Sequence, residues 1–379
     1  MQFNQLAGHH ELISRLKQSA REGRVAHAQL FAGTEGSGAL PLALAYANFL
    51  LCENPADDSC GHCPACKKIA KREHPDVHFA FPVVKTDKTG TNAVSKELIS
   101  EWREFVNSRP YGAELDWYDQ LGVDNKQGNI SVHESAEILK ALSLKSYEGG
   151  YKIMLIWLPE KMNTAAANKL LKILEEPPQM TVFLLVSHQA ESLLTTIQSR
   201  LQWIYVPRLD DENVTKYLME ELGVDPENAR LVASLAEGNL NRAIQIIQNN
   251  EGISTGTALF VEWARACYRP DYPKLIKWTE EVSRLGREHQ KDFLRLAISM
   301  MRDALLHHYG LGALERMGIT QQTFDLAKFA PFIHSGNIEN IIEELSRSHY
   351  EIERNANAKI VFLDTSLQLH RLLRVPEPA

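Results

Sequence analysis

The sequence predicts an α/β domain with a parallel sheet, followed by a helical remainder. Before Pro207, near-continuous apolar runs of strand length alternate with helical patterns. Such runs are typical of strands buried on both faces of a parallel sheet, and their alternation with helices indicates a doubly wound arrangement. After Pro207 the strand-like runs stop and the pattern is helical to the end.

Five apolar runs are expected as strands, with helices interspersed. The strands are Ala26–Gly33, Asp76–Val83, Tyr151–Leu158, Thr181–His188 and Leu201–Pro207. The helices fall within residues 10–23, 39–52, 133–145 and 163–176. Residues 84 to about 130 interrupt this alternation with polar, glycine-containing stretches around an aromatic segment, so we expect an insertion that is partly helical.

The chain is long enough for more than one domain, because single hydrophobic cores stop growing beyond about 250 residues. We expect residues 1–207 to form the α/β domain, residues 208–249 a small helical domain and residues 250–379 a second helical domain. Asp210 precedes one helical pattern, and Asp225 followed by Pro226 is typical of an N-cap with proline in the first turn. The last domain ends in a long helical stretch from Asn337 to Arg374.

The composition is that of a folded globular protein, with 44% hydrophobic and 23% charged residues. A formal net charge of −7 gives no overall positive field toward a polyanion such as DNA, so nucleic-acid contacts are expected to be local or shared with partners. The first residues lack the apolar core of a signal peptide, and no apolar run approaches the length of a membrane span. We therefore expect a cytoplasmic protein without membrane association.

A glycine-rich segment, Gly33-Thr-Glu-Gly36-Ser-Gly38, follows the first expected strand and precedes a helix. Phosphate-binding loops occupy this position in nucleotide-binding α/β domains. A working loop continues with lysine, which neutralises phosphates, and with serine or threonine, which binds Mg²⁺. Here Ala39 and Leu40 stand in those positions, so the nucleotide-binding loop is degenerate. Taken alone, the segment also fits a tight glycine turn.

The strand Tyr151–Leu158 gives a second test of the same site. In ATP-hydrolysing relatives of this fold an acidic pair at its end binds Mg²⁺ and polarises water. Leu158 and Pro159 stand there instead, and Glu160 comes one position late. Because both ends of the site lack their chemical groups, we expect that this chain does not hydrolyse ATP.

Four of the five cysteines, Cys52, Cys60, Cys63 and Cys66, lie within one short segment. Their spacing includes two Cys-x2-Cys steps of the kind that bend around a tetrahedral ion, and four ligands leave no open position for chemistry. We expect a structural Zn²⁺ site, with free or redox-active thiols as the alternative. Cys267 stands alone in a helical pattern and is expected in a core.

Several stretches together resemble the clamp-loader branch of the AAA+ ATPases, and within it the delta-prime subunits of bacterial DNA polymerase III. They are GRVAHAQLFAGTEGSG, the four-cysteine module after the loop helix, TAAANKLLKILEEPP, TVFLLVSHQAESLLTTIQSRL, LAEGNLNRAIQI and IERNANAKIVFLDTSLQL. The gamma/tau subunits keep the lysine and the acidic pair, and delta subunits generally lack the cysteine module. The losses in this chain therefore favour the delta-prime type.

The resemblance implies an AAA+ domain, a helical lid at residues 208–249 and a C-terminal collar for oligomerisation at residues 250–379. It implies a stator that does not hydrolyse ATP. This stator would belong to a hetero-pentamer with gamma/tau and delta subunits, and the pentamer would load the sliding clamp on primed DNA as part of a DNA polymerase holoenzyme.

Ser199 and Arg200 match the family's Ser-Arg-Cys signature, with Leu201 in place of cysteine. In the family this arginine reaches the γ-phosphate bound by a neighbouring subunit, as an arginine finger in trans. The sensor arginine of the lid aligns near Asn241, with Arg242 one place later.

Other interpretations stay open at this point. A lone arginine in a loop is often solvated or paired with a local carboxylate. An active ATPase with an unusual site would need Glu160 and Lys161 as replacement groups. A zinc-dependent nucleic-acid-binding module would use the basic run from Lys67 to Arg72, although such runs are more often a solvated face.

Overall fold

The computed structural model describes residues 1–85, 89–90, 92–123, 128–248, 252–268, 271–311 and 326–377. Parts of the predicted insertion, at residues 86–88, 91 and 124–127, lie outside the described residues, as does the segment 312–325 of the predicted C-terminal domain. The chain forms two compact units. One comprises Met1–Val214 and Glu237–Arg242, and the other comprises Thr215–Ala236 and Ala243–Ala379.

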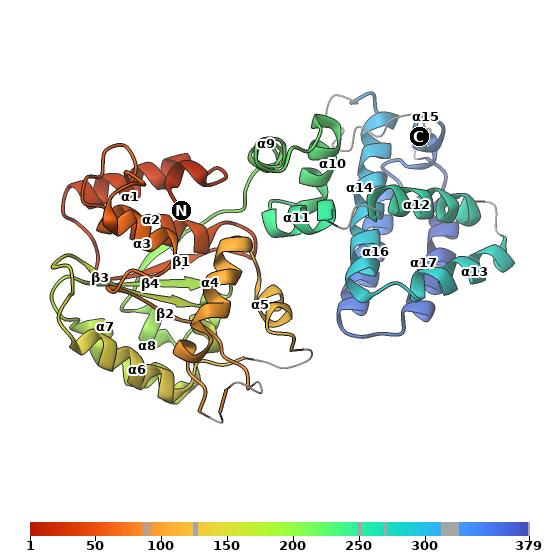
Figure 1. Ribbon diagram of the computed structural model, residues 1–379. Helices are drawn as coiled ribbons and strands as arrows, with labels where there is room; N and C mark the ends of the chain where they lie inside the picture. Colours follow the sequence, from red (N-terminus) through yellow and green to blue (C-terminus); the bar gives the residue numbers. More distant parts are fainter. Residues whose placement is uncertain are drawn as a thin grey trace. The chain divides into compact units, whose positions relative to one another are not determined.

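The first unit is built on a parallel sheet of five strands in the order β2-β3-β4-β1-β5 (Figure 1). The strands are β1 (Ala28–Ala32), β2 (Val77–Ala80), β3 (Lys152–Trp157), β4 (Thr181–Ser187) and β5 (Gln202–Tyr205). Each lies inside one of the five predicted runs, so the predicted parallel sheet is confirmed. Because β1 pairs with both β4 and β5, the segment that follows β1 lies at the carboxyl edge beside the ends of those two strands.

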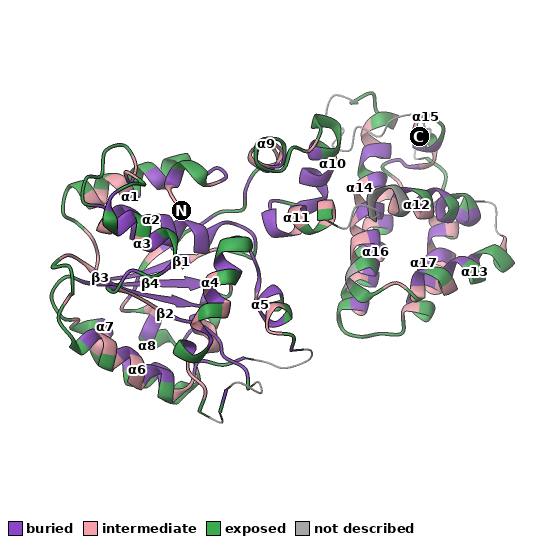
Figure 2. Cartoon of the chain, in the orientation of Figure 1, coloured by how far each residue is buried: buried purple, intermediate pink, exposed green. Residues whose placement is uncertain are grey.

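Helices cover both faces of this sheet (Figures 1 and 2), and successive strand residues belong to the hydrophobic clusters on opposite faces. Phe31, Leu155 and Leu184 belong to the core cluster shared with α1, α2, α4 and α5. Leu30 and Leu185, one residue away along their strands, belong to the cluster shared with α6, α7 and α8. The helices are α1 (His10–Arg21), α2 (Ala39–Leu51), α3 (Pro64–Ala70), α4 (Ile99–Ser108), α5 (Glu114–Gln120), α6 (Val132–Ser143), α7 (Thr164–Glu175) and α8 (Thr195–Gln198). Helices α4 and α5 lie within residues 84–130, so the described part of this segment is partly helical, as expected.

The rest of the chain is helical. Helices α9 (Asp211–Leu222), α10 (Pro226–Ala236), α11 (Leu240–Gln248), α12 (Gly252–Tyr268), α13 (Tyr272–Ser283), α14 (Arg287–His308), α15 (Leu326–Phe329), α16 (Ile338–Glu353) and α17 (Ala358–Leu372) follow in order. The predicted helix starts are present, since the Asp210 and Asp225 carboxylates accept amide hydrogen bonds from Asn213 and Asn228.

The core of the second unit is rich in aromatic rings. Trp263 and Trp278 stack with their ring centroids 5.3 Å apart, and Cys267 is fully buried in the same cluster, where a core residue was expected. The stretch from Asn337 to Arg374 is helical as expected and consists of two helices, α16 and α17. No helix in the described ranges is long and apolar enough to cross a membrane.

Candidate functional site

The predicted phosphate loop is the connection between β1 and α2. Strand β1 ends at Ala32 and α2 begins at Ala39, with Gly38 as its N-cap residue. Gly36 and Gly38 have φ angles of 68° and 94°, which side-chain-bearing residues rarely adopt. The Gly33 amide donates to the Ser187 carbonyl at 3.1 Å and ties the loop to the end of β4. The sequence therefore located the loop correctly.

The two positions that would carry the phosphate cation and the Mg²⁺ ligand are apolar and buried. Ala39 is 2% and Leu40 is 3% exposed, and both belong to the core beneath the sheet face. His9 approaches the loop, with Nε2 2.6 Å from the Ser37 carbonyl oxygen, so this nitrogen carries the donated proton. Burial lowers the pKa of His9 below its usual value, and the ring is therefore no cationic substitute at neutral pH.

Residues Asn239 to Asn241 lie directly against this loop. The Leu240 amide donates to the Gly36 carbonyl at 3.1 Å. A Cβ placed on Gly36 would stand 1.8 Å from Oδ1 of Asn239, so only glycine fits beneath this side chain. Asn241, at the predicted sensor position, donates from Nδ2 to Oδ2 of Asp116 in α5 at 2.7 Å, and both residues are buried. Residues Asn239 to Asn241 of the same chain therefore pack on the loop that binds phosphates in nucleotide-binding α/β domains.

The replacement groups required for an unusual ATPase are engaged elsewhere. Glu160 accepts hydrogen bonds from Oγ of Ser187 at 2.8 Å and from the amide of His188 at 2.9 Å. Burial raises the pKa of this carboxyl. Lys161 pairs with Glu114 at 2.8 Å. Leu158, where an acidic residue would stand, is buried with a φ of 55°.

The four predicted metal ligands come together. The Sγ atoms of Cys52, Cys60, Cys63 and Cys66 all lie within 4.8 Å of one another. A tetrahedral zinc with bonds of about 2.3 Å would place its sulfurs about 3.8 Å apart, so these thiols need only a small contraction to close around the ion. The donor set, four thiols and no oxygen, suits Zn²⁺.

Backbone amides support the thiolate forms of this cluster. The amides of Cys60, Cys63 and Cys66 point at the sulfurs of Cys52, Cys60 and Cys63, at 3.2 to 3.4 Å. Amide hydrogen bonds from His62 and Cys63 lower the pKa of the Cys60 thiol to about 6, while burial raises the pKa of the Cys52 and Cys66 thiols above their usual range. The residues present therefore fit a structural zinc ion.

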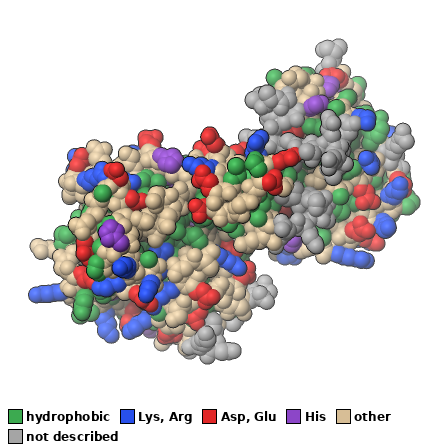
Figure 3. Space-filling model, turned by 45° about the horizontal axis from the view of Figure 1, so that its top comes forward, with side chains coloured by type: hydrophobic (Ala, Val, Ile, Leu, Met, Phe, Trp, Pro, Cys, Tyr) green, Lys and Arg blue, Asp and Glu red, His purple; other side chains and the backbone are tan. Residues whose placement is uncertain are grey.

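Some side chains of the basic run from Lys67 to Arg72, next to the cysteines, already form ion pairs or hydrogen bonds within the chain. Lys68 pairs with Glu148, which also lies 2.9 Å from Nε2 of the buried His74. Arg72 is buried and donates to the Ile69 carbonyl at 3.0 Å. On the face shown in Figure 3, Lys and Arg side chains lie among Asp and Glu side chains. This run is therefore only in part available to a nucleic acid.

Arg200 lies between α8 and β5, where its guanidinium contacts its own chain. Its Nε donates to Oε1 of Glu175, the last residue of α7, at 2.7 Å, and Nη2 contacts the same oxygen. Its Nη1 donates to the Thr196 carbonyl at 2.5 Å and approaches Oγ of Ser199 at 3.3 Å. The sequence identified Arg200 and Ser199 as candidates and left a local carboxylate contact open as the alternative; the structure shows such a contact, with Glu175, which the sequence did not single out.

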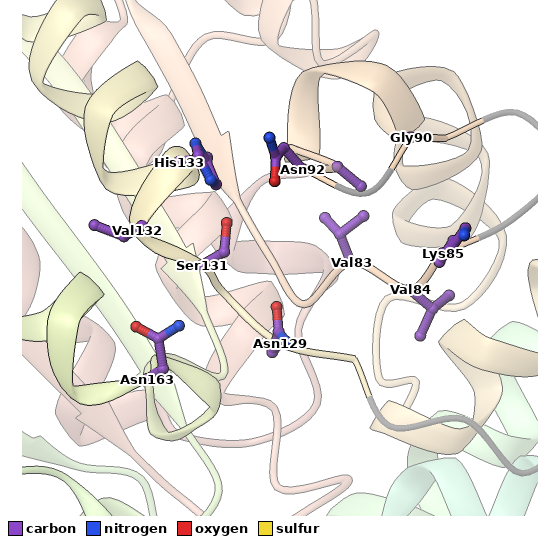
Figure 4. A pocket seen from close by; sticks show the side chains of 11 residues that line it. Val83, Val84, Lys85, Gly90, Asn92, Asn129, Ser131, Val132, His133 and Asn163 are labelled. Carbon is purple, nitrogen blue, oxygen red and sulfur yellow. The ribbon is translucent and has the colours of Figure 1, made fainter.

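A polar pocket of about 550 Å³ lies apart from these residues, and none of the predicted site residues lines it. Asn129 and Ser131 form one wall, and Asn92 faces them across the opening (Figure 4). His133 and Asn163 contribute from the first turn of α6 and the N-cap of α7. Sequence analysis did not find this pocket, because its residues come from four separate short segments.

The parallel sheet with helices on both faces and the glycine-rich loop after β1 define a protein of the phosphate-loop α/β class. The sequence profile of the family described as "DNA polymerase III, delta subunit" matches residues 8–210, which is more than half of the chain. The chain belongs to this family, and the resemblance to delta-prime subunits is confirmed.

Curated relatives carry related names. The chain is 28% identical to DNA polymerase III subunit delta' of Bacillus subtilis over 236 residues, covering 62% of this chain and 58% of that protein. It is 25% identical to subunit delta' of Escherichia coli over 316 residues, covering 83% and 80%. It is 23% identical to subunit tau of B. subtilis over 385 residues, covering 95% and 60%.

Proposed function

We propose that this chain is the non-hydrolysing delta-prime subunit of a DNA polymerase III clamp loader. In this role it is a stator of a hetero-pentameric ring with gamma/tau and delta subunits, which loads the sliding clamp on primed DNA in the cytoplasm. Family membership and the similarity to both delta' and tau subunits support a place in a clamp-loader complex. Residues 208–249 would be the lid and residues 250–379 the collar.

The observation that carries this proposal is the state of the phosphate loop. The lysine and hydroxyl positions are the buried Ala39 and Leu40, and Leu240 donates to the loop carbonyl of Gly36. Phosphoryl transfer depends on positioning and on electrostatic stabilisation of phosphate charge. A loop that offers no cation and no metal ligand supplies neither, so ATP chemistry in the ring falls to other subunits.

Arg200 would act on such a neighbouring site. A guanidinium supplied in trans stabilises the charge that develops on the transferred phosphate. Nη1 of Arg200 contacts the Thr196 carbonyl and Oγ of Ser199, which places the guanidinium at the surface between α8 and β5. The side chain is 28% exposed and is therefore accessible to a partner.

Zn²⁺ would be held by Cys52, Cys60, Cys63 and Cys66 in a structural role. Four thiolates satisfy a tetrahedral ion completely, so the ion would stabilise the segment that joins α2 to α3 and take no part in chemistry.

The test is nucleotide binding and hydrolysis by the purified free chain, beside a ring reconstituted with gamma/tau and delta. We expect no saturable binding of a fluorescent ATP analogue and no turnover above background by the free chain. Turnover by the free chain that is lost on Glu160→Gln would support the unusual ATPase instead. A Glu176→Gln chain, altered at an exposed carboxylate away from the loop, is the control.

A further inference from the structure

Glu175 and Arg200 form a resting pair, defined here by the contacts of Nε and Nη2 of Arg200 with Oε1 of Glu175. Nε and Nη2 form the edge of a guanidinium that binds carboxylates and phosphates through two parallel hydrogen bonds. In this chain that edge is already occupied by Glu175, and Nη1 is occupied by the Thr196 carbonyl. A phosphate oxygen and Glu175 therefore compete for the same donors.

The position of Glu175 makes this pair more than an incidental surface contact. Glu175 is the last residue of α7 and is followed by Glu176, so two carboxylates stand at the end of a helix where the backbone carbonyls already concentrate negative charge. Such charges are unfavourable at a helix C-terminus unless a cation compensates them. Arg200 is that cation for Glu175, and in return the local field holds the guanidinium over α7.

The attraction between Arg200 and Glu175 is weak enough for a phosphate to displace Glu175. The side chains of Arg200 and Glu175 are 28% and 46% exposed, so water screens their attraction. Exposed pairs of this kind favour the closed state by roughly 2- to 5-fold. A γ-phosphate with its higher charge offers a stronger anion, and it can take the guanidinium from Glu175 once a neighbour presents it.

We propose that Glu175 is a positioning residue that holds Arg200 in a resting conformation and releases it to the neighbour's phosphate when the subunit interface closes. This inference rests on the proposed function, since it assumes that Arg200 acts in trans. It adds a regulatory element in this chain. The resting pair lowers the ATP hydrolysis of a ring whose interface is not fully closed.

The experiment uses the reconstituted ring with Glu175→Gln, which keeps the shape of the side chain and removes its charge. We expect the ATPase rate without DNA to rise by roughly 2- to 5-fold, because the competitor is weakened, and the rate at saturating primed DNA to stay unchanged. Glu176→Gln removes the same charge one residue away and is expected to change neither rate. In the free chain, the Nε–H proton of Arg200 is expected to exchange faster with water in Glu175→Gln, as measured by NMR, and not in Glu176→Gln.

Arg200→Ala separates this inference from the proposed function. If Arg200→Ala leaves the rate of the ring unchanged, the trans finger is wrong, whatever Glu175 does. If Arg200→Ala lowers the rate but Glu175→Gln fails to raise it without DNA, the finger stands and the resting pair is refuted. A rise caused by Glu175→Gln that persists in the Arg200→Ala background would also refute it, because the effect would not pass through Arg200.

Discussion

Gly36 is the glycine at which the loop between β1 and α2 meets Asn239 and Leu240, and its replacement by alanine tests that contact. A Cβ at this position would stand 1.8 Å from Oδ1 of Asn239 and 2.9 Å from the Leu240 nitrogen. Neither distance is tolerable, so the segment must move away from the loop. The hydrogen bond from Leu240 to the Gly36 carbonyl would be lost, at about 0.5–1.5 kcal/mol.

A second cost arises because Gly36 has a φ of 68°. An alanine in this left-handed region costs about 1–2 kcal/mol by itself. Gly23 provides the matched control, since its φ is 67° and a Cβ there meets nothing within 4 Å. The conformational cost is therefore common to both variants, and their difference isolates the contact with residues 239 and 240.

We expect Gly36→Ala to lower the free energy of unfolding by about 1–3 kcal/mol more than Gly23→Ala does, measured by urea denaturation. Amide exchange at Leu240 is expected to accelerate only in Gly36→Ala. In the double variant Gly36→Ala with Asn239→Ala, the losses should be less than additive, because the clash with the carboxamide is gone. Equal destabilisation by Gly36→Ala and Gly23→Ala would refute the packing of residues 239 and 240 on the loop.

Two further predictions concern the cysteine cluster and a buried carboxyl. Cys63→Ser should abolish binding of one Zn²⁺ per chain and should raise amide exchange in residues 52–74 before the sheet is affected. The control Cys267→Ser, altered in the other unit, should still bind the metal. A metal-free wild-type chain with four freely titratable thiols would contradict this prediction. Burial raises the pKa of Glu134 to about 7 from a usual 4.5, so the folded chain loses stability as the pH rises through this range. The free energy of unfolding of Glu134→Gln, measured by urea denaturation, should therefore exceed that of the wild type by about 3 kcal/mol at pH 8 and equal it near pH 4.5. A difference between the two proteins that does not change with pH would count against a buried charge at Glu134.

The sheet could be predicted because its signal is local and strong. Each strand lies in an apolar run; β1, β3 and β4 are buried along almost their whole length, whereas β2 and β5, at the two edges of the sheet, are partly exposed. The sequence analysis gave residues 337–374 only as a helical stretch and did not place the break between α16 and α17. Asn355 has a φ of 68°, which asparagine tolerates, and Asn357 caps α17 by accepting the Lys359 amide at 3.1 Å. These two asparagines were the available signal for two helices.

The candidate site divides in the same way into local and distant parts. The loop and the four cysteines are each contained in one short segment, so spacing alone brings their groups together. The pairs Arg200–Glu175 and Asn241–Asp116 join residues 25 and 125 positions apart. Nothing in a sequence distinguishes these polar side chains from the many that face water, because their partners are chosen by the packing of α7 against α8 and by the position of α5.

The two halves of the site explain why some residues of an ATPase are kept and others are replaced. On the proposed function, this chain hydrolyses no ATP and needs neither the lysine nor the metal ligand, and Ala39 and Leu40 fill those positions with core contacts. Gly36 is required in this chain for packing, because the absence of a side chain lets Asn239 and Leu240 lie against the loop. On the proposed function, Arg200 serves a neighbour's site as a finger in trans, so its role does not depend on a nucleotide bound by this chain. On the proposed function, the loop between β1 and α2 serves only as a packing surface for Asn239 and Leu240, while Arg200 acts on a neighbour's phosphate. The resting pair with Glu175 makes that action depend on the assembly of the ring.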